Sequence, residues 1–125
     1  MSISSIRTIL LAEPTVTDIV GDEIYVGFAD QEVRQPFLVL DDLTIDPVDC
    51  KGEGDLDDYR FAVTAVGLNY GSVETVMNAV RNTLGGYSDS VYRNIKFAGI
   101  DEMYDGTQDA FIRTFIFRTF KTIDT

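Results

Sequence analysis

The chain has 125 residues, which is close to the commonest size of one folded domain, and 45% of them are hydrophobic, as in a globular protein. It has no histidine and one cysteine, Cys50, which excludes Ser-His and Cys-His nucleophile pairs, histidine-based zinc sites and an internal disulfide framework. The formal net charge of −11 repels phosphate and disfavours a basic nucleic-acid-binding surface, although solubility alone is an equally good explanation of the acidity. We expect one domain over residues 1–125.

The first residues, MSISSIRTILLAEP, predict a short amphipathic helix over 3–12 and no membrane span. Ile3, Ile6 and Leu10 recur at helical spacing, and the apolar stretch is far too short to cross a bilayer. Pro14 suits the first turn of a second short helix, PTVTDIV, which Gly21 would end. The lone cysteine and the absence of a signal peptide lead us to expect synthesis in a reducing cytoplasm.

Two strands are predicted next, over residues 23–29 (EIYVGFA) and 37–45 (FLVLDDLTI), because both are rich in β-branched and aromatic residues. A third strand is predicted over 58–68, where apolar and polar residues alternate, and Gly67 would mark a bulge or a bend in it. Between the second and third strands lies an acidic segment punctuated by a proline and two glycines.

A helix is predicted over 73–84, with Ser72 as its N-cap and Glu74 in its first turn. A fourth strand over 91–100 and a fifth over 110–123 follow, joined by a turn at 101–109. The connections at 30–36 and 101–109 suit antiparallel pairing. The order of elements therefore predicts an α+β fold, in which helices pack on one face of a mostly antiparallel sheet of about five strands.

The acidic segment 41–58 contains eight carboxylates and raises three alternatives: a metal cage, an acid/base pair, or a solvated loop. Its carboxylates have no spacing that fixes a coordination geometry, and its glycines would not hold an acid/base pair in place. Clustered like charges repel and keep a segment extended in water. We therefore expect a mobile acidic loop in this segment, between the second and third predicted strands.

A second metal test concerns DEMYDG, where Asp101, Asp105 and Gly106 match positions 1, 5 and 6 of a calcium loop. Position 3 would be Met103 and position 12 would be Ile112, neither of which suits a hard cation. A hairpin turn at Asp105-Gly106 is the better interpretation. No cofactor or metal requirement is therefore expected.

The last predicted strand carries phenylalanines on both faces, interleaved with cations. A strand that is apolar on both sides is either buried in a core or meets a partner, and both alternatives stay open here. The candidate subunit-interface residues are Phe111, Arg113, Phe115, Phe117, Arg118 and Phe120.

The order of these motifs resembles the tail-completion, or tail-terminator, proteins of long-tailed bacteriophages. The matching pieces are LLAEPTVTDIVGDEIYVG, QPFLVL, YRFAVTAVG, VETVMNAVRNTLGGY and the hairpin IKFAGIDEMYDGTQDAFIRTFIFRTF, in that order. IVGDEIYVG and the late YD turn before an aromatic strand are the most telling of them. The resemblance covers nearly the whole chain, and no single motif in it is specific.

This resemblance implies an α+β subunit that closes into a ring, commonly of six, at the head-proximal end of the tail. The ring would cap the tail tube, stop its growth and meet the head connector, while DNA passes through without specific binding. The protein would be made in the bacterial host cytoplasm and become part of the phage virion, with no membrane, catalysis or cofactor involved. The acidic segment would then serve contact or repulsion, with these candidate residues: Asp49, Lys51, Glu53, Asp55, Asp57 and Asp58.

Two alternatives remain. One is a head–tail adaptor, or neck protein, of similar size, whose partner would be the head connector. The other is a small binding module or hydrolase that uses a divalent metal on the acidic segment.

Overall fold

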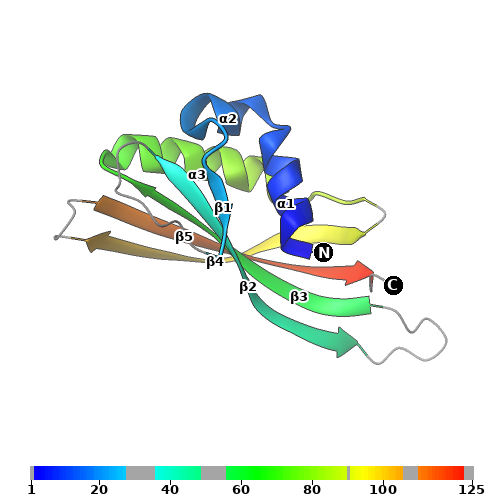
Figure 1. Ribbon diagram of the computed structural model, residues 1–125. Helices are drawn as coiled ribbons and strands as arrows, with labels where there is room; N and C mark the ends of the chain where they lie inside the picture. The colour runs from blue at the N-terminus through cyan, green and yellow to red at the C-terminus, as the bar shows by residue number, and fades with distance from the viewer. Residues whose placement is uncertain (1, 28–35, 49–55, 90, 106–109, 123–125) are drawn as a thin grey trace.

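The computed structural model describes residues 2–27, 36–48, 56–89, 91–105 and 110–122. Three helices and five strands lie within these ranges, and Figure 1 labels them. In chain order they are α1 (Ser2–Leu11), α2 (Pro14–Val20), β1 (Ile24–Val26), β2 (Phe37–Val48), β3 (Leu56–Gly67), α3 (Tyr70–Leu84), β4 (Tyr92–Asp105) and β5 (Ala110–Thr122). Of the helices in the described ranges, none has the length and hydropathy needed to span a membrane.

The strands form one sheet in the order β1-β2-β3-β5-β4. The pairs β2–β3, β3–β5 and β4–β5 are antiparallel, which confirms the predicted α+β fold with a mostly antiparallel sheet. The pair β1–β2 is parallel, so the prediction that the connection at 30–36 joins antiparallel strands is wrong. Backbone hydrogen bonds from Leu38 N to Glu23 O (3.0 Å) and from Gly27 N to Leu40 O (2.9 Å) hold this parallel edge.

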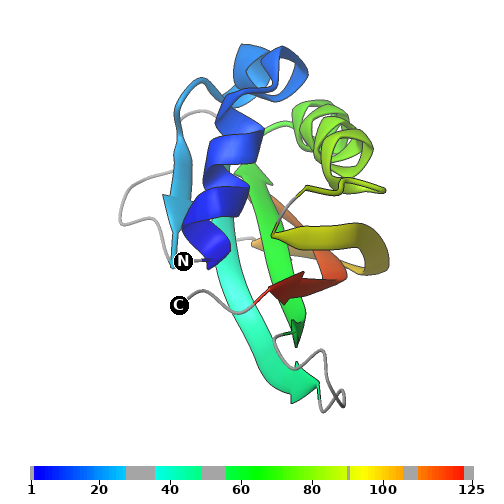
Figure 2. The same cartoon turned by 90° about the vertical axis from the view of Figure 1, so that its right-hand side faces the viewer.

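All three helices lie on one face of the sheet, as Figures 1 and 2 show. The odd-numbered residues of β3, from Tyr59 to Ala65, point toward the helices and are buried. Helix α3 buries one stripe at spacings of three and four against them. We call the opposite side of the sheet, toward which the even-numbered residues of β3 and β5 point, the outer face.

The helix boundaries differ from the prediction at the start of α3. The N-cap is Asn69, whose side-chain oxygen accepts a hydrogen bond from Ser72 N at 3.3 Å, so Ser72 lies inside the helix. Glu74 consequently lies beyond the first turn. The error arises because Asn and Ser are nearly equal as N-caps, and only the backbone conformation chooses between them. Gly21 ends α2 as predicted, with its N–H donating to Thr17 O at 2.8 Å.

Strands β2, β3 and β4 are longer than the sequence pattern indicated, whereas β1 is shorter than the predicted 23–29. β2 continues to Val48 and β3 begins at Leu56, so residues 46–48 and 56–58 are paired in a hairpin and are not loop. β4 similarly runs to Asp105 through most of the expected turn. Cross-strand hydrogen bonds extend a hairpin even where the side chains are acidic or turn-forming, which propensity alone does not predict.

Gly67 marks neither a bulge nor a bend, because it pairs regularly with Phe111. The register shifts lie instead between Asp42 and Thr44 in β2 and at two points in β4. A Cβ at Gly67 would lie 3.0 Å from Cγ2 of the buried Val73. This glycine therefore lets α3 start close against the end of β3.

Candidate functional site

The last strand, β5, separates its side chains cleanly between the two faces of the sheet. Phe115 and Phe117 point toward the helices and are 1% and 0% exposed. Phe117 lies between the rings of Phe61 (5.4 Å) and Phe97 (5.8 Å). Core packing is therefore the favoured alternative for these two phenylalanines, since neither presents its side chain to a partner.

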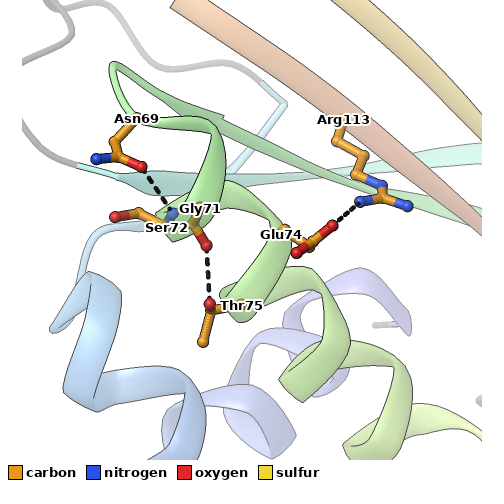
Figure 3. Close-up of polar contacts among 6 residues, drawn as sticks. All are labelled: Asn69, Gly71, Ser72, Glu74, Thr75 and Arg113. Carbon is orange, nitrogen blue, oxygen red and sulfur yellow. Dashed lines mark hydrogen bonds and ion pairs between the residues drawn. The ribbon is translucent and has the colours of Figure 1, made fainter.

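Phe111 and Arg113 point to the same side as this core. Phe111 is partly buried against it, with its ring 5.6 Å from that of Tyr70. Arg113 lies under α3, where its Nη1 is 4.0 Å from Oε2 of Glu74 (Figure 3) and its guanidinium is 5.3 Å from the Phe115 ring. Figure 3 also shows this ion pair one turn beyond the Asn69 cap, and Thr75 Oγ1 donating to Gly71 O within the same helix. These contacts join the start of α3 to the sheet.

Arg118 and Phe120 point to the outer face, and both are exposed. Arg118 donates two hydrogen bonds to Asp58 on β3, from Nε to Oδ1 (2.9 Å) and from Nη2 to Oδ2 (2.7 Å). These hydrogen bonds from Arg118 lower the pKa of Asp58 below its usual value. Of the six candidate interface residues, only these two therefore have exposed side chains.

The acidic candidates divide into two groups. Asp49, Lys51, Glu53 and Asp55 lie outside the residues that the structure describes. Asp57 and Asp58 lie on β3 and each meets a cation, since Asp57 Oδ2 is 3.5 Å from Nζ of Lys121. The structure therefore places these two carboxylates in intramolecular ion pairs within a strand, where the sequence had suggested a solvated loop.

A partly buried polar cluster, which the sequence did not reveal, surrounds Lys121 where β5 pairs with the start of β3. Lys121 is only 8% exposed, and its ammonium group lies 5.8 Å from the ring of Tyr59. The Tyr59 hydroxyl donates to the carboxylate of Asp42 on β2. Burial, together with the charge of Asp42, raises the pKa of the neighbouring Asp41. The cluster thus links β2 to β3 through Tyr59 and Asp42, and β3 to β5 through Asp57 and Lys121.

The outer face also carries a row of cations that the sequence did not reveal. In the register, Arg60 of β3 stands opposite Arg118 of β5, and Arg118 stands opposite Lys96 of β4. We call these three residues the cation row; all three are exposed. Arg93 follows in the next row, opposite Phe120. These residues are far apart in the sequence, and their only local signal is that each occupies an outward position of its strand.

The described residues contain no group of three or more Asp, Glu, Cys or His side chains arranged to hold a metal ion.

Comparisons with known proteins place this fold among virion proteins. A family model described as tail completion protein gp17 matches residues 4–121. A solved structure of the virion of a native gene transfer agent particle contains a chain with a TM-score of 0.75 and 14% identity, aligned over 97% of this chain and 98% of that chain. The TM-score shows that the two chains share a fold.

Two structures of proteins from Akkermansia muciniphila align less well, with TM-scores of 0.35 and 0.36 and 10% identity. They cover 68% and 67% of this chain and 46% and 42% of their own, and they carry no argument here. None of the curated protein sequences matches this chain.

Proposed function

Because this chain belongs to the tail completion protein gp17 family, it is a structural tail protein of a phage virion, and from that premise we propose that it closes into a ring. The ring, of about six copies, caps the finished tail tube at its head-proximal end. It stops tube growth and provides the surface that joins the head connector. The family match is the observation that carries this proposal, because it spans nearly the whole chain.

The shape of the molecule supports an assembly role. The helices cover one face of the sheet, while the described residues place no helix on the other. Threonines and aliphatic side chains occupy the part of the outer face near Val66 and Ile112, and charged side chains occupy the part near Arg60. Protein interfaces commonly have an apolar core and a polar rim, and these two neighbouring parts of the outer face fit that arrangement. One core cluster runs from Ile3 to Phe117, which supports a single domain.

The net charge of −11 supports the passage of DNA through such a ring without adhesion, because like charges repel. Asp57 and Asp58 contribute little to that repulsion, since Lys121 and Arg118 offset their charges. The repulsive wall is better sought among carboxylates that have no such partner. We propose no catalytic activity and no cofactor for this chain.

A direct test uses the purified protein with and without tail tube protein. We expect rings in negative-stain images, either free or seated on tube ends, and tubes that stop growing once capped. A chain that stays monomeric and never binds tube ends would refute the proposal.

The second candidate function is a head–tail adaptor, which the same fold and size would suit. Parallel pull-downs with tube protein and with head-connector protein separate the two. Binding to the connector but not to the tube would favour the adaptor. A third candidate, a divalent-metal module, predicts a rise in melting temperature on adding Mg²⁺ or Ca²⁺.

A further inference from the structure

The part of the outer face around Arg60 is richer in positive charge than the rest of this strongly acidic protein. The cation row and Arg93 together hold four of the ten Lys and Arg residues of the chain. Three carboxylates stand beside them on the same face: Asp58, the exposed Asp46, and Asp41, which pairs with Ala62. The patch therefore has four cations and three carboxylates, whereas carboxylates outnumber cations in the chain as a whole.

This arrangement is unfavourable within one chain. Directly opposed residues on adjacent strands have their Cβ atoms roughly 5 Å apart, and like charges at that distance destabilise a sheet. Asp58 compensates Arg118 through the bidentate pair described above, and its charge also attracts Arg60. Among the described residues, Arg60 and Lys96 have no ion pair of their own. A surface that an anionic partner covers would relieve this repulsion.

A complementary surface lies on the other side of the molecule. Between residues 8 and 33 the sequence has six carboxylates and no Lys or Arg. Four of the six lie in and beside α2, and we call them the acidic end: Glu13, Asp18, Asp22 and Glu23. Figure 1 shows α2 above α3, which itself lies on the sheet, so the acidic end and the outer face are on opposite sides. Asp18 and Asp22 are exposed.

We propose that the cation row of one copy docks against the acidic end of the next copy. The partner that covers the outer face is thus a second copy of this chain, because its acidic end carries charge opposite to that of the cation row. A contact between two different, opposite surfaces is heterologous, and repeating it closes a ring when the rotation permits. This inference rests on the proposed function, because it names the contact from which the ring is built.

Duplex DNA is the other anion that could meet this patch. The three carboxylates within the patch and the charge of −11 on the chain oppose binding to phosphate, so a protein partner is favoured. DNA binding remains an outcome that the experiment measures.

The experiment reverses charge on each side separately. Variant one carries Arg60→Glu and Lys96→Glu, which leaves the Asp58–Arg118 pair intact. Variant two carries Asp18→Lys and Asp22→Lys. We expect each variant alone to raise the dissociation constant of self-association by roughly tenfold or more, since like charges then face each other. An equal mixture of the two should restore assembly, because each contact in an alternating ring again joins opposite charges.

The matched control keeps the net charge equal. Arg60→Gln with Lys96→Gln lowers the formal charge by the same amount as Asn78→Glu with Asn82→Glu on the exposed side of α3. The double glutamine variant should weaken association, and the double glutamate variant on α3 should not. Wild-type association should also weaken toward about 1 M salt, where charges are screened beyond roughly 3 Å. Circular dichroism and thermal melts on every variant show that each one folds.

The outcomes separate the two proposals. If wild-type protein neither self-associates nor caps tubes, the proposed function fails, and this inference fails with it. If wild-type rings form and both reversed variants form them equally well, the inference is overturned and the function stands. If the mixture of reversed variants stays apart, the two surfaces are not partners. Loss of duplex DNA binding in variant one with unchanged assembly assigns the patch to nucleic acid and also overturns the inference.

Discussion

Replacing Phe117 by Ala tests whether β5 is core or interface. The ring is 0% exposed and lies 5.4 Å from Phe61, 5.8 Å from Phe97 and 6.4 Å from Phe115, measured between ring centroids. Its removal loses the burial of an aromatic side chain and leaves a cavity, a change that costs about 3–5 kcal/mol in protein cores. The same substitution at Phe120, which is 40% exposed, should cost less than about 1 kcal/mol.

A loss of this size is easy to measure, because the total free energy of unfolding of a domain is about 5–15 kcal/mol. Urea unfolding followed by circular dichroism, at concentrations where the chain does not self-associate, should show a large drop in midpoint for Phe117→Ala with an unchanged slope. Phe117→Leu, which keeps most of the volume, covers the case in which the alanine variant does not fold. If Phe117→Ala loses less than about 1 kcal/mol, or less than Phe120→Ala, the placement of this strand is wrong.

Three further predictions concern local features. Asn69→Ala should lower the free energy of unfolding by about 1 kcal/mol, because it removes the acceptor for Ser72 N. An unchanged melting temperature would contradict this assignment of the N-cap. Gly67→Ala should lower the free energy of unfolding by about 1–3 kcal/mol, because the new Cβ would press against Val73. The loss should be smaller when Val73 is also replaced by Ala, and additive losses would show that the two sites do not touch. Burial raises the pKa of Tyr92 to about 12, whereas the usual pKa of a tyrosine is 10. The stability that its neutral phenol contributes is therefore complete below pH 10. It declines by about 3 kcal/mol between pH 10 and 12. Tyr92→Phe should flatten that decline in alkaline urea titrations, and an identical pH profile would contradict the assignment.

The helices and most strands could be predicted from the sequence because their signals are local. The three- and four-residue spacing from Val73 to Leu84 fits one side of a helix. Alternation from Tyr59 to Ala65 likewise indicates which side of β3 is buried. The order of helices and strands then predicted an α+β fold. Where signals compete locally, as between Asn69 and Ser72 at the start of α3, the prediction failed by a few residues.

The tertiary structure decided everything that depends on which strands are neighbours. Nothing near β5 in the sequence indicates that it lies between β3 and β4, or that β1 runs parallel to β2. The same holds for the candidate surfaces, because Arg118 is 60 positions from Asp58 and meets it only through the register of β3 with β5. Propensity and periodicity act over a few residues, whereas register is set by how a whole sheet packs on its helices. The sequence alone therefore determined the composition of the acidic and cationic surfaces, and folding determined that three cations from three strands stand in one row.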